Sequence, residues 1–355
     1  MSSAFGNKIH VSIFGQSHGE KIGCVIDGLP AGEPVDTEAL GRFLARRAPG
    51  QKGATQRRET DAPHIVSGVV NGHTCGAPLC VLIDNADTRS GDYEQLRDVP
   101  RPGHADYPAA VRFRGYQDVR GGGHFSARLT APLCAAGGIL LQLLARRGVR
   151  IGAHLLAVGD VRDQPMDPMM TDDAALDGLL EGFPVFDPEK GREMLDKAEE
   201  MRRLQDSVGG VVECAVLHLP AGLGGPMFDG LENRIAQAVF AIPAVKGIEF
   251  GEGFAASALR GSENNDPYRV RDGQVVLLSN HAGGILGGLS SGAPLIFRAA
   301  FKPTPSIARP QQSVSLSRME DRELVISGRH DPCVAIRAVP CVEAAAALAL
   351  ADLLL

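Results

Sequence analysis

The strongest signal for the fold is the string Leu29-Pro30-Ala31-Gly32, because it recurs as Leu219-Pro220-Ala221-Gly222. Each copy follows an apolar segment typical of a strand and precedes a segment typical of a helix. Two more echoes occur in the same order: Gly76-Ala77-Pro78-Leu79 with Gly292-Ala293-Pro294-Leu295, and Arg128, Pro132 and Cys134 with Arg337, Pro340 and Cys341. Together they predict a duplicated chain in which two helix starts, each with an arginine, converge on one central site.

The predicted halves span about 8–150 and 208–355, and residues 1–355 are expected to form a single domain. Residues 160–206, between the halves, are richer in charge, Asp and Met, and are interpreted as a peripheral insertion. The polar segment 49–61 has no hydrophobic period, so we expect a loop that closes over a site.

Residue patterns place the main elements. Strands are predicted at 9–14 and 24–27, and a pair of strands at 65–70 and 79–83. Asp36 is expected to cap a helix to about Arg47, and Ser126 to cap a longer apolar helix. Asp229 and Glu232 have the spacing of a capping box before a further helix. Residues 340–355 are apolar almost all round, which is typical of a helix in the core or in a subunit interface.

The composition is that of a globular chain: 355 residues, 44% hydrophobic and 22% charged. The longest apolar run, 344–351, is far shorter than the roughly 20 residues that a membrane span needs. The first residues lack the apolar region of a signal peptide. The seven cysteines include no C-x-x-C pair, so they are expected to be buried thiols in a reducing compartment. We therefore expect a cytoplasmic protein with no membrane partner.

The charge distribution indicates a small anionic ligand. A formal net charge of −6 argues against nucleic acid as a partner. The arginines are nevertheless clustered around positions 46–58, 101–128 and 329–337. Such local basic pockets suit a polyanion, because guanidinium groups bind phosphate and carboxylate bidentately. For any one pair of these arginines, the alternative is that both side chains lie on the protein surface in contact with water.

The segment 101–128 has the character of a site. Its run Gly121-Gly122-Gly123 sacrifices side-chain packing, which is tolerated mainly where the backbone turns tightly or approaches a ligand. The run leads into the helix start at Ser126, where free N–H groups and the helix dipole favour an anion, and Arg120 and Arg128 add positive charge. A glycine-rich turn beside solvated arginines explains the same residues.

Three glycine- or proline-bearing loops carry histidines: His18, His104 and His330. The loop 15–19 matches G-x-S-x-G, but the strand predicted after it rules out a nucleophile elbow, which needs a helix there. The histidines and the nearby carboxylates Glu20, Asp106 and Asp331 could form a metal site, although no pair has H-E-x-x-H spacing. Polar loop histidines with ordinary partners are a second alternative. A third interpretation, in which these side chains act as acid–base groups around a bound anion, explains more of the sequence.

The chain resembles the chorismate synthase family from about Lys8 onward. The resemblance rests on six strings: Gly15-Gln16-Ser17-His18-Gly19, Arg101-Pro102-Gly103-His104-Ala105-Asp106-Tyr107, Arg120-Gly121-Gly122-Gly123, Ser279-Asn280-His281-Ala282-Gly283-Gly284-Ile285-Leu286-Gly287-Gly288, Lys302-Pro303-Thr304-Pro305-Ser306 and Gly328-Arg329-His330-Asp331-Pro332. It implies an α+β fold: a β-α-β sandwich with long central helices between antiparallel sheets and an internal pseudo-two-fold repeat. It also implies a homotetramer.

The resemblance implies a lyase of the shikimate pathway, on the route to the aromatic amino acids. Its reaction is the anti-1,4-elimination of phosphate and a ring proton from 5-enolpyruvylshikimate 3-phosphate, which gives chorismate. Reduced FMN is required but not consumed: it donates electron density as phosphate departs and then takes the ring proton. The sequence leaves open whether NADPH reduces the flavin.

The resemblance also implies residue roles. His18, beside Ser17, protonates the departing phosphate; His104 stabilises the reduced flavin; Asp331, with Ser126, helps flavin N5 act as the base. The substrate is held by Arg47, Arg101, Arg128 and Arg329. The flavin is held by Phe125, Ser126, Ala127, Pro243, Ala244, Gly287, Lys302, Pro303, Thr304, Pro305, Ser306 and Arg329. No metal is implied.

Several residues depart from the family's pattern. They are Gln16 for Glu, Ala48 and Gly53 for arginines, His124-Phe125 for Arg-Ser, and Pro243 for Asn. We expect Lys52 or Arg57 to make the anion contact that Gly53 lacks. Activity is still expected, because every acid–base residue is present. The alternatives are a metal-dependent phosphohydrolase and a non-catalytic flavin-binding or scaffold protein.

Overall fold

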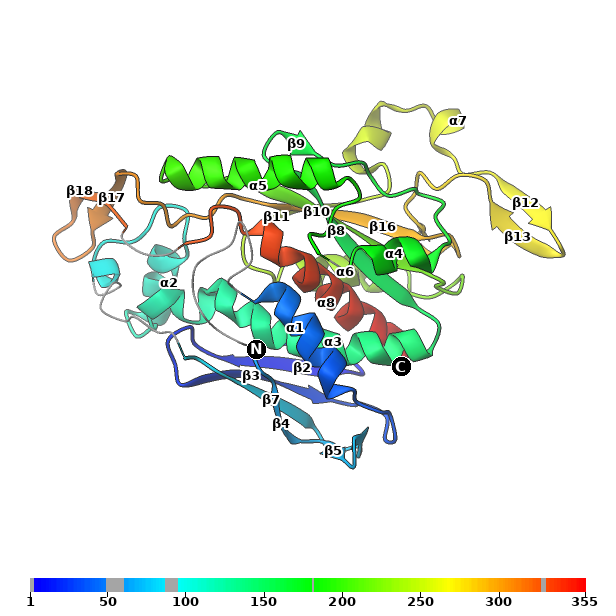
Figure 1. Cartoon of the computed structure of the whole chain (residues 1–355), viewed down its shortest axis with the longest axis horizontal. Coiled ribbons are helices and arrows are strands. Elements are labelled where there is room, and N and C mark those ends of the chain that lie inside the picture. The colour runs from blue at the N-terminus through cyan, green and yellow to red at the C-terminus, as the bar shows by residue number, and fades with distance from the viewer. Residues whose placement is uncertain (1–2, 49–60, 87–94, 181, 327–329) are drawn as a thin grey trace.

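Two antiparallel sheets enclose a layer of helices (Figure 1). The computed structural model describes residues 3–48, 61–86, 95–180, 182–326 and 330–355. The first sheet has the order β1 (Ala4–Phe5), β2 (His10–Gly15), β3 (Lys21–Asp27), β7 (Leu79–Asp84), β4 (His64–Ser67). The second has the order β11 (Val245–Phe250), β16 (Leu295–Phe301), β10 (Gly210–Leu217), β8 (Arg150–Val158), β9 (Val161–Arg162). The predicted α+β sandwich is confirmed.

The remaining elements are helices and small hairpins. The α-helices are α1 (Thr37–Arg47), α2 (Asp106–Phe113), α3 (Thr130–Arg146), α4 (Asp173–Gly178), α5 (Pro188–Arg203), α6 (Leu231–Val239), α7 (Gly261–Asn264) and α8 (Ala335–Leu354). Short 3-10 helices are η2 (Arg120–Phe125), η3 (Ala127–Leu129), η4 (Met227–Asp229) and η5 (Gly253–Ala258). The hairpins pair β5 (Val69–Val70) with β6 (His73–Thr74), β12 (Tyr268–Arg271) with β13 (Gln274–Leu277), β14 (Ile285–Leu286) with β15 (Leu289–Ser290), and β17 (Gln311–Ser315) with β18 (Glu320–Leu324).

The internal repeat is visible in the sheet order. Strands β2-β3-β7-β4 of the first sheet match β8-β10-β16-β11 of the second, and the closing helices α3 and α8 match as well. The repeated turns also bond alike: Thr74 Oγ1 donates to the Pro30 carbonyl at 2.6 Å, and Ser290 Oγ donates to the Pro220 carbonyl at 2.5 Å. The echo in the sequence is therefore a pseudo-two-fold repeat of structure.

The boundary of the second half differs from the prediction. Strand β8 pairs with β10, so it belongs to the second sheet, and the second half begins at Arg150 rather than near 208. The segment 160–206 consequently lies between two strands of that half. Its helix α5 covers the outer face of the second sheet (Figure 1). Strand β10 is therefore buried on both faces, whereas β7 of the first sheet alternates between buried and partly exposed residues.

The central layer is formed by α1, α3, α6 and α8 (Figure 1). Helices α3 and α8 approach so closely that a Cβ added to Gly137 would lie 2.3 Å from the Ala344 Cβ. Helix α8 is buried almost throughout, as expected for the core alternative. Within the described residues, the single segment long and apolar enough to span a membrane is Ala127–Arg146, and 83% of its apolar window is buried inside the protein.

The chain ends are tied together. The Asp352 carboxylate, near the end of α8, accepts hydrogen bonds from the amides of Asn7, Lys8 and Ile9 at 2.7, 2.7 and 3.0 Å. Asp352 also pairs with Arg234 of α6. Burial alone would raise the pKa of Asp352, but these contacts hold it below its ordinary value.

Three helix starts test the capping predictions. Asp36 caps α1, accepting hydrogen bonds from Glu38 and Ala39, as predicted. Ser126 caps the 3-10 turn η3, which precedes α3, instead of α3 itself. The prediction of a capping box at Asp229 and Glu232 is wrong. Asp229 is the last residue of the 3-10 helix η4, and α6 begins after Gly230 without a side-chain cap.

Candidate active site

The three glycines form a turn against which two histidines lie. Gly121, Gly122 and Gly123 have φ of +60°, +86° and +55°, which L-residues with side chains rarely adopt. A Cβ on Gly121 would lie 2.6 Å from His18 Cδ2, and one on Gly122 would lie 3.1 Å from His104 Nε2. The glycines are therefore needed to bring these side chains close. The sequence predicted an anion against this turn; the described residues place histidines there.

His18 and Ser17 occupy the loop between β2 and β3. Both are buried, with 6% and 2% of their surface exposed. The Ser17 amide donates to the Gly123 carbonyl at 3.0 Å, and the Asn85 side chain donates to the Gly19 carbonyl at 2.8 Å. Ser17 Oγ is buried and has no hydrogen-bond partner among the described residues. The loop is thus fixed to the glycine turn, with a hydroxyl group available.

His104 is oriented by a buried ion pair. Its Nδ1 lies 2.6 Å from Asp106 Oδ1, and Arg101 binds the same carboxylate through Nε at 2.7 Å and Nη2 at 2.8 Å. Burial alone would raise the pKa of Asp106, but hydrogen bonds from Arg101 and His104 hold it well below its usual range. The ionised carboxylate therefore fixes the proton on Nδ1, and Nε2 faces Gly122.

Arg47 and Arg128 share one buried carboxylate. Arg128 Nη1 pairs with Asp61, and Arg47 Nε lies 3.2 Å from Asp61 Oδ2. Asp61 has a φ of +50°, which is uncommon for a residue other than glycine. Arg128 also donates to Asn85 Oδ1 at 2.8 Å. Two guanidinium groups and one carboxylate leave a net positive charge, which suits an anion.

Asp331 is held by an arginine at the start of α8. Arg337 Nη1 donates to Asp331 Oδ2 at 2.8 Å, and Arg337 Nε donates to the Arg47 carbonyl at 3.0 Å. Arg337 is the repeat partner of Arg128. The two helix starts thus converge, as the duplication predicted.

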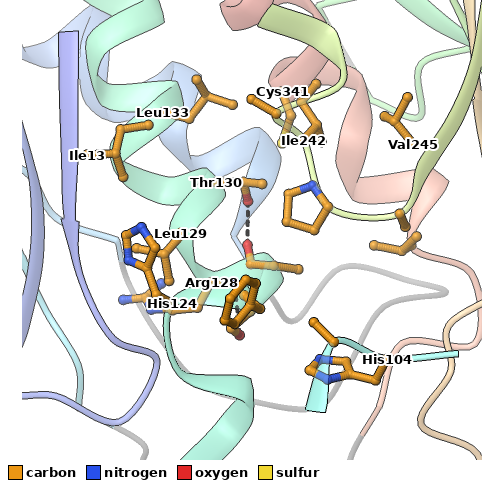
Figure 2. Close-up of a pocket in the computed structure, with 18 of the residues that line it drawn as sticks. Ile13, His104, His124, Arg128, Leu129, Thr130, Leu133, Ile242, Val245 and Cys341 are labelled. Carbon is orange, nitrogen blue, oxygen red and sulfur yellow. Dashed lines mark hydrogen bonds between the residues drawn. The ribbon is translucent and has the colours of Figure 1, made fainter. Parts of the chain in front are cut away.

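A central cavity of about 1180 Å³ lies beside these groups, and His18 and Ser17 are not among the described residues that line it. Its polar wall includes Arg47, Arg101, His104, Arg128, Asp331 and Arg337. Its apolar wall includes Ile13, Leu129, Leu133, Ile242, Val245 and Cys341 (Figure 2). Lys246 and Lys302 also line the cavity, and burial together with the charge of Lys246 lowers the pKa of Lys302. The cavity therefore joins an apolar surface to cationic groups.

A family model described as chorismate synthase matches residues 9–355. A chorismate synthase from Lancefieldella parvula is 48% identical over 366 residues, covering 100% of this chain and 96% of that protein. A chorismate synthase from Thermococcus kodakarensis is 46% identical over 352 residues, covering 99% and 97%. The chain belongs to the chorismate synthase family. A solved structure described as a crystal structure of chorismate synthase has a TM-score of 0.78 and 26% identity, covering 99% of this chain and 92% of that one.

Family membership confirms the resemblance and the enzyme prediction. The chain is a lyase of the shikimate pathway that acts on a small molecule. Its central cavity is the candidate active site. Among the described residues, no three His, Cys, Asp or Glu side chains gather in a group that could hold a metal ion.

The residues predicted to bind flavin divide into three groups. Those that line the cavity are Phe125, Ser126, Ala127, Pro243, Ala244, Lys302, Thr304, Pro305 and Ser306. Pro303 and Gly287 do not line it, and Gly287 lies in the exposed turn between β14 and β15. Arg329 is outside the described residues, as are Lys52, Gly53 and Arg57 of the polar segment 49–61.

Two of the residues that depart from the family's pattern, His124 and Phe125, make contacts that the structure defines. His124 Nδ1 lies 2.8 Å from the Gly15 carbonyl, and its Nε2 lies 2.7 Å from Ser3 Oγ. His124 therefore fastens the glycine turn to β2 and to the N-terminal segment. Phe125 packs beside Phe113, with ring centroids 6.2 Å apart, at the cavity wall.

Sequence reasoning missed Asp61, Lys246 and the part that Asp106 plays in orienting His104. It placed Arg337 at a helix start that converges on the site but assigned it no partner or role there. The echo with Arg128 was the signal that could have assigned it. Nothing local distinguishes Asp61, because its two arginine partners are distant in the sequence.

Proposed function

We propose that this chorismate synthase converts 5-enolpyruvylshikimate 3-phosphate to chorismate in the central cavity, with reduced FMN bound beside the substrate. The observation that carries the proposal is the pair of histidines held against the glycine turn, next to arginines that line the cavity. Small-molecule pockets are typically about 300–1,000 Å³. A cavity of about 1180 Å³ therefore has room for a substrate and a cofactor together.

The residues present fit a flavin. The apolar wall suits a planar ring system, and Lys246 and Lys302 suit a phosphate group. Phe125, Ser126, Ala127, Pro243, Ala244, Lys302 and Thr304 to Ser306 would hold it, together with Arg329. Gly287 and Pro303 keep their predicted role only if the assembled homotetramer brings them to a cavity. Bound reduced flavin supplies transient electron density for phosphate departure and an acceptor for the ring proton.

The side chains of the protein bind the charged groups of the substrate and transfer protons. His18 donates a proton to the departing phosphate, and Ser17 Oγ hydrogen-bonds beside it. His104 lines the cavity, and Asp106 accepts a hydrogen bond from its Nδ1–H, so the ring keeps one orientation. Arg47, Arg101 and Arg128, with Arg329, bind the phosphate and the carboxylates. Asp331, with Ser126, assists removal of the ring proton, and the hydrogen bond from Arg337 holds the Asp331 carboxylate in place.

The test is anaerobic release of phosphate and chorismate from 5-enolpyruvylshikimate 3-phosphate, with chemically reduced FMN. We expect turnover to require reduced flavin and to fall in both His104→Ala and Asp331→Ala. Phosphate release without flavin, or without chorismate, would favour a metal-dependent phosphohydrolase instead. Flavin binding without turnover would favour a binding protein. The same assay with NADPH in place of the chemical reductant asks whether the chain reduces its own flavin.

A separate experiment tests the role predicted for the polar segment 49–61. Lys52 or Arg57 is expected to supply the anion contact that Gly53 lacks, so Lys52→Ala or Arg57→Ala should raise the substrate KM with kcat nearly unchanged. An unchanged KM in both variants contradicts this role.

A further inference from the structure

Cys134 and Cys341 meet where the central helices cross. Their Sγ atoms lie 3.7 Å apart, one on α3 and one on α8. They are repeat partners, so the pair lies between the two halves of the fold. Gly137, one turn further along α3, permits this close approach, because any side chain there would collide with Ala344.

The two thiols differ in their surroundings. Cys341 lines the central cavity (Figure 2) with 2% of its surface exposed, whereas Cys134 is fully buried and is not among the lining residues. A hydrogen bond from the Cys134 thiol, aided by the charges of Arg47 and Arg337, lowers the pKa of Cys341 in spite of its burial. Burial raises the pKa of Cys134 well above its ordinary value. Of the two sulfurs, the one that lines the cavity therefore has the lower pKa.

We propose that Cys134 and Cys341 form a redox-active dithiol, in which Cys341 meets an oxidant entering through the cavity and Cys134 closes the disulfide. The proposal needs the cavity and the helix crossing, and it does not rest on the proposed reaction. Closing the disulfide requires the sulfur atoms to move from 3.7 Å to about 2.0 Å apart.

The oxidant we name is hydrogen peroxide. The Cys341 thiolate attacks one peroxide oxygen, the O–O bond breaks, and the departing hydroxide takes a proton to leave as water. The resulting sulfenic acid is attacked by the Cys134 sulfur; the S–O bond breaks and a second water leaves with the Cys134 proton. Two thiols and one peroxide therefore give one disulfide and two waters.

The test treats the reduced, full-length protein with hydrogen peroxide, alkylates the remaining thiols and maps unreduced peptides by mass spectrometry. We expect the Cys134–Cys341 linkage to form at least about tenfold faster than oxidation of the exposed Cys75, because thiolate content sets the rate. Dithiothreitol should reverse it. Oxidation of Cys75 with no Cys134–Cys341 linkage overturns the proposal.

Variants separate the two roles. In Cys134→Ala, Cys341 should stop at the sulfenic acid, which dimedone captures; in Cys341→Ala, Cys134 should remain reduced. Cys75→Ala is the matched control and should leave the linkage unchanged. Oxidation of Cys134 at an undiminished rate in Cys341→Ala contradicts the assigned order. If either buried variant fails to fold, the wild-type peptide map still decides.

Discussion

The two halves of the fold are alike at their turns and different at their helix starts. At the turns, Thr74 and Ser290 make the same hydrogen bonds to equivalent backbone groups. At the helix starts, Arg128 follows a glycine turn that holds two histidines, whereas Arg337 follows Asp331. The difference shows that the duplication supplies a symmetric scaffold, and that the site is built where the copies have diverged.

The largest expected effect on stability comes from replacing Asp61, whose carboxylate forms ion pairs with both Arg47 and Arg128 of the first half. Asp61→Asn leaves two buried guanidinium groups without their carboxylate, so the free energy of unfolding should fall by about 3–5 kcal/mol. Urea unfolding measures it. Asp84→Asn is the control: this half-exposed carboxylate pairs with Lys21 at the surface, and its loss should change stability little. Equal losses in both variants would contradict a special role for Asp61.

The next effect concerns the glycine turn. Gly121→Ala places a methyl group 2.6 Å from His18 Cδ2 and 2.7 Å from Ser17 Oγ, so turnover should fall about 100-fold. The matched change is Gly32→Ala in a repeated turn, where φ is +86° but nothing lies within 4 Å of the new Cβ. It should cost about 1 kcal/mol of stability and keep turnover. Normal turnover in Gly121→Ala would show that the turn does not position His18.

Asp106→Asn tests the orientation of His104. Loss of charge-assisted hydrogen bonds should lower stability by about 1.5–3 kcal/mol and reduce kcat. Because the folded-state pKa of Asp106 is lowered, its stabilisation is fully present above the unfolded pKa of about 3.9 and is lost as pH falls through the folded pKa. Urea unfolding of wild type and variant should therefore differ equally from pH 8 to 5 and converge in stronger acid. A difference that disappears near neutral pH would contradict this.

The smallest effect tests the symmetric turns. Thr74→Val and Ser290→Ala each remove a donor to a proline carbonyl and an acceptor for a backbone amide. Each should cost about 1 kcal/mol, with turnover unchanged. Thermal unfolding and the anaerobic assay measure both. A loss of turnover in one variant alone would mean that the turns are not equivalent.

Local patterns predicted the scaffold well. The repeated turns, the Asp36 cap and the buried last helix are set by neighbouring residues, so the sequence contains them directly. The membership of β8 in the second sheet depends on pairing with β10, about 60 residues away, and no local pattern encodes it. The insertion was therefore placed between the halves instead of within one.

The candidate site was predicted by residue type more than by arrangement. The sequence singled out His18, His104 and the glycines, but it did not reveal that each histidine lies against a different glycine. The ion pair of Arg47 and Arg128 with Asp61 joins three distant segments, so only the folded chain shows it.

The bond between Asp352 and the amides of residues 7–9 has a consequence for biosynthesis. Ser3, Ala4 and Phe5 form part of the cavity wall, and the carboxylate that fixes the residues after them is made more than 340 positions later. During translation residues 7–9 therefore leave the ribosome long before Asp352 is made. We therefore expect this wall of the candidate site to be fixed only after the last turn of α8 has emerged, in a docking step that follows translation.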